Sequence, residues 1–213
     1  SVTLFWNSPP LFDDWLPALR KATAQDGVRI LRHRVVRDDC SQFLVSTRPA
    51  TKPSTIIWSI KGRLQNLVRA ERPHAFHRNY NLLSVGSTKL ERAEAYVAMQ
   101  LRQHSNDIEQ IPAEFHDLQF ANPEVDLSLP RFSSHGRFSC NLHIVFIRAG
   151  REPDSRPAAW LAVWNMIRKA STEKQHLLSR LGILPDHVHM TLGIHPDESP
   201  ETVALSYMNN IAF

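Results

Sequence analysis

Residues 185–213, "PDHVHMTLGIHPDESPETVALSYMNNIAF", contain the pattern on which the fold prediction rests. In a β-strand alternate side chains share a face, and every second residue from Val188 to Ile194 is apolar. His187 and His189 therefore share the opposite face. A polar turn bracketed by prolines and an amphipathic helix follow. The stretch predicts a strand, a turn and a helix, with two neighbouring histidines on the side of the sheet away from the apolar core.

The same pattern occurs earlier, in residues 38–66, "DDCSQFLVSTRPATKPSTIIWSIKGRLQN". The two segments align without a gap at a constant offset of 147 residues. The identical pairs are Asp39 and Asp186, Pro49 and Pro196, Pro53 and Pro200, Thr55 and Thr202, and Ser59 and Ser206. Upstream of each copy, residues 2–23 and 142–171 both read as a strand, a loop and a helix that contains tryptophan. Agreement in the copies and in their flanks indicates an internal repeat.

The repeat predicts three parts of the chain: a first unit at 1–103, a linker at 104–138 and a truncated second unit at 139–213. The linker has no steady hydrophobic period and is rich in turn formers. Strands alternate with helices in each copy, and the connections are too short for a large parallel sheet. We therefore expect an α+β fold, with two antiparallel-sheet units in tandem and the helices of each unit on one face.

Composition excludes some classes of protein and leaves others open. The 213 residues have a net charge of +4 and a pI near 9.3, which permits a polyanionic partner without identifying one. No apolar run approaches the roughly 20 residues of a membrane span, and the N-terminus has no signal-peptide pattern. Cys40 and Cys140 are too few for a disulfide scaffold, which favours a reducing cytoplasm.

A helix is predicted over residues 86–103, with Thr88 and Glu91 as a capping box. Tyr96 and Gln100 are four residues apart, so both project from one side of this helix. Two interpretations remain open at this point. The tyrosine lies at a helix rim, as many do, or it is a nucleophile whose polar neighbour reaches the same ion or phosphate.

The histidine pair is open to two interpretations as well. Neighbouring imidazoles can hold a metal ion, or they can be an ordinary surface or packing pair. In the first copy Cys40 and Gln42 occupy the positions of His187 and His189. A change of both residue types is less expected for a structural pair, which favours a function for the histidines of the second copy.

Four stretches together resemble one family. They are "LPDHVHMTLGI", "SIKGRLQN", "NYNLLSVGSTKLERAEAYVAMQ" and "LHIVFIR", and they are similar to the single-tyrosine HUH transposases, which include the insertion-sequence-200-like and REP-associated enzymes. The family's histidine–hydrophobe–histidine motif matches residues 187–189, and its tyrosine helix matches residues 96–100. The resemblance covers most of residues 1–102 and 139–213 and does not include the linker.

The resemblance implies small ferredoxin-like (RRM-like) units that cut and rejoin single-stranded DNA at hairpins in a bacterial, nucleoid-associated cytoplasm. It implies that His187, His189 and Gln100 hold a divalent metal, Mg²⁺ or Mn²⁺. It also implies that Tyr96 attacks the phosphodiester and forms a 5′-phosphotyrosine intermediate. Asp186 could orient a ligand from the turn, but a structural role in the Pro-Asp turn is the favoured expectation. His143 is expected to pack within its strand.

Many family members are dimers in which the tyrosine helix of one subunit serves the histidines of the other. Here one such site has all its parts, and the second has lost its histidines to Cys40 and Gln42. This pattern predicts a fused pseudo-dimer with a single active site. Some relatives instead use the tyrosine within one subunit. In that case the protein would be a catalytically inactive DNA-hairpin-binding module.

The densest basic stretch supplies candidate DNA contacts. These are Lys61, Arg63, Arg69, Arg72 and Arg78; a solvated helix face is the alternative. A metal-dependent phosphodiesterase that uses the histidine pair on small molecules or RNA is a third possible function. It predicts turnover that is independent of Tyr96.

Overall fold

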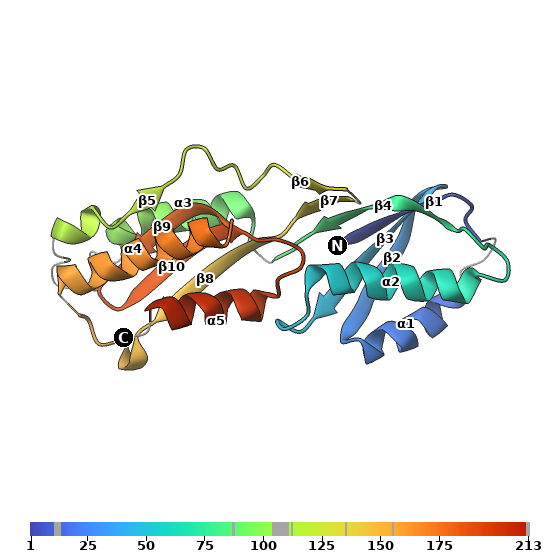
Figure 1. Ribbon diagram of the computed structural model, residues 1–213, viewed down its shortest axis with the longest axis horizontal. Helices are drawn as coiled ribbons and strands as arrows, with labels where there is room; N and C mark the ends of the chain where they lie inside the picture. The colour runs from blue at the N-terminus through green and yellow to red at the C-terminus, as the bar shows by residue number, and fades with distance from the viewer. Residues whose placement is uncertain are drawn as a thin grey trace. The chain divides into compact units, whose positions relative to one another are not determined.

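The computed structural model describes residues 1–10, 14–86, 88–103, 111, 113–134, 136–154 and 156–211. For residues 102 and 103 it describes the backbone only. It is a mixed α/β structure with two β-sheets (Figure 1). Contacts divide it into two units. The first contains residues 1–85, 130–140 and 196–201; the second contains residues 86–129, 141–195 and 202–213. Among the described residues, no helix is both long and apolar enough to cross a membrane.

The first unit begins with two strand–helix–strand segments. Its elements are β1 (Val2–Trp6), α1 (Trp15–Gln25), β2 (Val28–Arg37), β3 (Cys40–Thr47), α2 (Pro53–Val68), β4 (Phe76–Leu83), β6 (Arg131–Ser133) and β7 (Gly136–Ser139). The strand order is β2-β3-β1-β4-β7-β6. Neighbouring strands are antiparallel except for β4 and β7, which are parallel.

One face of this sheet packs against α1 and α2 (Figure 1). Leu4 and Phe43 of the strands are fully buried, as are Leu19 of α1 and Ile60 and Leu64 of α2. These apolar side chains form the core of the first unit. The two cysteines of the chain are buried free thiols.

The second unit contains the other sheet. Its elements are α3 (Leu90–Gln103), the short 3₁₀ helix η1 (Ala113–His116), β5 (Phe120–Ala121), β8 (Asn141–Ile147), the 3₁₀ turn η2 (Ala149–Arg151), α4 (Pro157–Glu173), β9 (Leu177–Ile183), β10 (His187–Gly193) and most of α5 (Pro200–Ile211). The strand order is β5-β9-β10-β8, and all neighbours are antiparallel. The central position of β10 leaves every one of its residues buried.

The predicted alternation along β10 is confirmed. Met190 lies opposite Leu181 of β9 and Ile144 of β8 on the apolar face. His187 and His189 lie on the other face, yet they are only 5% and 6% exposed. The sequence predicted that this face would lie away from the apolar core. Instead α3 packs on β9 and β10 there.

The bounds of the elements reproduce the offset seen in the sequence. Strand β3 starts at Cys40 and β10 starts at His187, while α2 starts at Pro53 and α5 at Pro200. Both pairs are 147 residues apart, so strand and helix recur in register with the repeat. Both helices have proline near their first turn, where the missing N–H costs nothing.

The contact-based units differ from the predicted division at 1–103, 104–138 and 139–213. Helix α3 groups with the second unit because its apolar side chains pack on β9 and β10. Within the predicted linker, η1, β5, β6 and β7 form, and β7 pairs with β4 of the first unit. Residues 104–110, 112 and 135 of that linker lie outside the described residues.

Candidate functional site

Helix α3 brings Tyr96 against the histidines of the second sheet. The centroid of the Tyr96 ring lies 5.3 Å from that of His189 and 6.4 Å from that of His143, with steep interplanar angles. The rings of His187 and His189 are 4.8 Å apart, as expected for alternate residues on one face. Four rings therefore meet in one place, three from the sheet and one from the helix.

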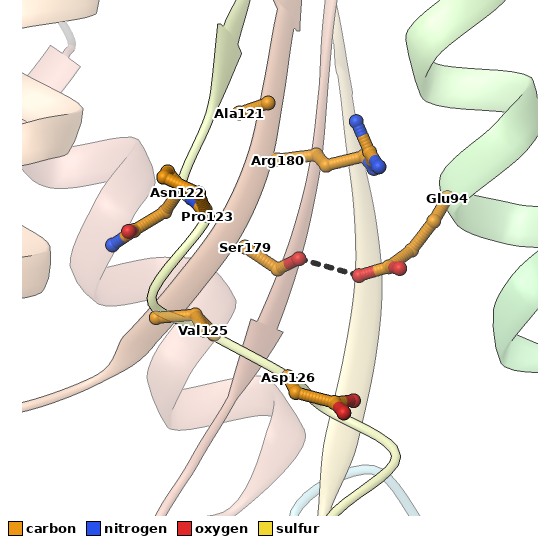
Figure 2. A pocket seen from close by; sticks show the side chains of 8 residues that line it. All are labelled: Glu94, Ala121, Asn122, Pro123, Val125, Asp126, Ser179 and Arg180. Atoms are coloured by element: carbon orange, nitrogen blue, oxygen red, sulfur yellow. Dashed lines mark hydrogen bonds between the residues drawn. The ribbon is translucent and has the colours of Figure 1, made fainter.

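The position of α3 follows from the apolar stripe along it. Ala93 and Val97 are buried at the helix–sheet contact. The carboxylate of Glu94 accepts a hydrogen bond from the Ser179 hydroxyl of β9 at 2.5 Å (Figure 2). The helix begins at Leu90, and the Lys89 carbonyl accepts the first helical bond from Ala93, so the predicted cap at Thr88 is wrong by one residue.

Gly182 lets α3 approach the sheet closely. It lies directly opposite His189 on the neighbouring strand. A Cβ at this position would lie 2.8 Å from Gln100 Oε1 and 3.3 Å from the Val97 carbonyl oxygen, which is closer than normal packing allows. The glycine therefore leaves room for the Gln100 amide beside His189.

Gln100 is fully buried, and its amide oxygen and nitrogen have no hydrogen-bond partner among the described residues. Leaving a buried amide unpaired costs about 1–3 kcal/mol. Such a group next to a histidine pair is typical of a site that is completed by a ligand.

Both histidines of the motif are held through Nδ1. His187 Nδ1 pairs with Asp186 Oδ1 at 2.5 Å, and His189 Nδ1 pairs with His143 Nε2 at 3.0 Å. Burial lowers the pKa of His143, which favours its neutral form. An imidazole that is held at one nitrogen presents the other in a fixed direction.

Two of these residues have contacts that the sequence did not fully predict. The sequence favoured a structural role for Asp186 in the turn over orientation of a ligand, and it favoured packing for His143. The structure pairs each with a motif histidine instead. The alignment of β8 with β10, in which His143 lies opposite Thr191, determines this contact. Strand register is a tertiary property, so no spacing within the sequence could have identified His143.

A cavity of about 530 Å³ lies beside α3 in the same unit (Figure 2). It is lined by Glu94, Ala121, Asn122, Pro123, Val125, Asp126, Ser179 and Arg180. Arg180 is two residues before Gly182, and its Nε is buried without a hydrogen-bond partner in the described part of the chain. Because Ser179 and Arg180 belong to β9, the cavity borders the strand that pairs with β10 at His189.

The residues of the predicted metal site offer two imidazoles and one amide. In the described ranges no three His, Cys, Asp or Glu side chains are grouped so as to hold a metal ion. The predicted site therefore combines the two imidazoles with the Gln100 amide. The unpaired amide oxygen of Gln100 lies beside Gly182, the residue opposite His189, and so fits the role of a metal ligand. Imidazole nitrogens together with an amide oxygen are a donor set that Mn²⁺ accepts.

The predicted DNA contacts lie in the first unit, and the structure gives several of them internal partners. Lys61 Nζ donates to the carbonyl oxygens of His77 and Arg78, and burial lowers its pKa. Arg63 makes two 2.6 Å hydrogen bonds to Asp26. Of the other predicted contacts, Arg72 donates to backbone oxygens at Pro9 and Glu71, and Arg69 and Arg78 are exposed. Binding of DNA by these side chains stays a prediction.

The positions equivalent to the histidines have different surroundings in the first unit. Cys40 is buried, and the Gln42 amide oxygen accepts a hydrogen bond from Arg34 Nε at 2.7 Å. No imidazole occupies either position. The histidine arrangement is thus present in one of the two repeat copies.

Comparison with known proteins gives one finding. Residues 137–211 match the model of the family described as "Transposase IS200 like". The chain matches no curated protein and no solved structure. The matched segment contains β8, α4, β9, β10 and α5, and so includes His143, His187 and His189. It supports a relation to the IS200-like transposases through the second unit.

Proposed function

We propose that this protein is a single-stranded DNA endonuclease and strand transferase of the tyrosine HUH type. Tyr96 is the nucleophile, and His187, His189 and Gln100 hold one divalent ion, Mg²⁺ or Mn²⁺. The observation that carries the proposal is the contact of Tyr96 with His189 beside the buried, unpaired Gln100 amide. The family match over residues 137–211 supports the same class.

The reaction is a transesterification at phosphorus. The Tyr96 phenol loses its proton to solvent and attacks in line. A Tyr96 Oη–P bond forms as the P–O3′ bond breaks, and the leaving 3′ oxygen takes up a proton. The product is a free 3′-hydroxyl and a 5′-phosphotyrosine, which a second 3′-hydroxyl can attack in the reverse sense. When bound, the divalent ion would offset negative charge on the phosphate oxygens.

His143 and Asp186 act as positioning residues in this proposal. Each accepts or shares the Nδ1 proton of a motif histidine. With Nδ1 held, Nε2 is the nitrogen that each motif histidine turns toward a ligand. A neutral His143 suits this role, since it can accept a hydrogen bond.

The proposal includes a ferredoxin-like fold for both units and their origin as a fused pair. In support, the first unit runs β-α-β-β-α-β with strand order β2-β3-β1-β4, and the 147-residue offset recurs between the copies. One copy supplies the histidines, and α3, which follows the other copy in sequence, supplies Tyr96. As a DNA enzyme of this family, it would work in the bacterial cytoplasm.

Trapping of the covalent intermediate tests the proposal. The protein is incubated with Mn²⁺ and a pool of 3′-labelled single-stranded hairpin oligonucleotides, then denatured in detergent and separated by size. We expect labelled protein that disappears in Tyr96→Phe and in His189→Ala but persists in Tyr80→Phe. Hairpin binding without any adduct would refute the enzyme and identify the inactive binding module. Cleavage that survives Tyr96→Phe would identify the phosphodiesterase.

A further inference from the structure

The sheet of the first unit has one face that its own helices leave uncovered. Helices α1 and α2 pack on the face that carries Leu4 and Phe43. On the other face, Thr3, Phe5, Gln42 and Leu44 are only half-buried. In the second unit α3 covers the equivalent face, at the positions that correspond to Cys40 and Gln42.

A single row of side chains crosses all six strands on this open face. Its members, from β2 to β6, are Arg34, Gln42, Thr3, Asn81, Arg137 and Phe132. Two side-chain hydrogen bonds confirm that neighbours in the row point the same way. Arg34 Nε donates to Gln42 Oε1 at 2.7 Å, and Arg137 Nε donates to Asn81 Oδ1 at 2.9 Å. Each arginine is thus anchored through Nε, and both arginines remain exposed to solvent.

The charge of this sheet has one sign. None of its six strands contains aspartate or glutamate, and three exposed arginines of β2 lie on the open face, namely Arg29, Arg32 and Arg34. Arg32 lies opposite Leu44, and Arg29 lies opposite Ser46. By comparison, the four strands of the second sheet contain a single arginine, Arg180.

An aromatic ring lies at the far end of the row. Phe132 of β6 is 74% exposed. Exposed aromatic rings on a basic surface stack unpaired bases, while guanidinium groups bind the phosphates between them. Six strands span roughly 24 Å, at about 4.8 Å between neighbours, which is enough for several nucleotides of an extended strand.

We propose that this open face, from Arg32 and Arg34 to Phe132, is a binding platform for single-stranded DNA. It goes beyond the cleavage site on the second unit, and it rests on the proposed function only for the choice of DNA over RNA. The arginines of β2 hold the phosphates, and Phe132 stacks on a base. The degenerate copy thus keeps a DNA contact where it lacks the histidines.

The test measures binding of a fluorescein-labelled oligothymidylate of about 12 nucleotides by anisotropy, at several salt concentrations and in EDTA. Each phosphate contact contributes about 0.7 to the slope of log K against log[salt] for single strands. We expect the double variant Arg32→Gln/Arg34→Gln to lower that slope by about 1.4. The matched control Arg20→Gln/Lys21→Gln, at exposed positions of α1, leaves it unchanged.

Phe132→Ala separates stacking from charge. We expect it to weaken binding about 5- to 150-fold with little change in the salt slope, because base–aromatic stacking contributes about 1–3 kcal/mol. Three results would each overturn the proposal. They are an equal loss of DNA affinity in the α1 control, no loss of affinity in the sheet variants, and equal affinity for a duplex of the same charge. Since EDTA removes the divalent ion, the result is independent of whether Tyr96 cleaves DNA.

Discussion

Substitution of Gly182 by alanine tests the account of how α3 is held over the sheet. The new methyl group would meet the Gln100 and Gln119 amide oxygens at 2.8 and 2.9 Å and the Val97 carbonyl at 3.3 Å. A side chain can turn away, but the carbonyl belongs to the helix backbone, so α3 must shift. Overpacking of this kind costs about 1–3 kcal/mol. The gain from replacing a strand glycine offsets about 0.5–1 kcal/mol of it.

The net expectation for Gly182→Ala is a loss of about 0.5–2 kcal/mol in the free energy of unfolding, together with loss of the covalent DNA adduct. Urea denaturation followed by circular dichroism measures the first. The control is Gly62→Ala in α2, where a Cβ meets nothing within 4 Å. That change should stabilise the protein by about 0.5–1 kcal/mol, as for any open helical glycine. A Gly182→Ala protein that is as stable and as active as the wild type would refute the reasoning.

Three further predictions concern single side chains. Gln100→Met removes a buried, unpaired amide and should raise the unfolding free energy of the metal-free protein by about 1–2 kcal/mol. It should also weaken Mn²⁺ binding measured by calorimetry. An unchanged Mn²⁺ affinity would show that Gln100 is not a ligand. His143→Ala should weaken Mn²⁺ binding about 10- to 100-fold with the fold intact by circular dichroism, and an unaltered affinity would leave His143 with packing alone. Hydrogen bonds from Arg63 and then Ser59 lower the pKa of Asp26 to about 2. A lowered carboxyl pKa adds stability that is present above about pH 4 and is lost as the pH falls toward 2. Asp26→Asn should therefore lower the free energy of unfolding by about 1–2 kcal/mol at pH 7. Unfolding measured between about pH 2 and pH 7 should then show a smaller loss of stability at acid pH than in the wild type.

Local patterns in the sequence were enough for much of the second unit. Alternation along β10 and the 147-residue offset predict where strands and helices start, because both depend on short-range periodicity. The i,i+4 spacing puts Tyr96 and Gln100 on one side of α3. The family resemblance led us to expect the Tyr96 helix near the histidines. The pairing of β7 with β4 and the near-complete burial of the histidine face required the structure, because both depend on contacts between distant segments.

The basic residues show the same limit. Clustering of basic residues along the chain predicted DNA contacts at Lys61 and Arg63. In the structure Lys61 donates to backbone oxygens and Arg63 donates to Asp26. The arginines of β2 are spread over ten residues, and strand register alone places Arg34 in one row with Arg137. A cluster of basic residues along the sequence therefore does not identify the most basic surface of the folded protein.

The most direct test of the central claim is a crystal structure of Mn²⁺-soaked protein, with the ion located by its anomalous signal. The account predicts one strong peak bound by His187 Nε2, His189 Nε2 and Gln100 Oε1, with the Tyr96 hydroxyl facing it. It also predicts that His143 and Asp186 keep their bonds to the Nδ1 atoms. A peak elsewhere, or Mn²⁺ on the histidines with Gln100 turned away and Tyr96 remote, would contradict a composite site.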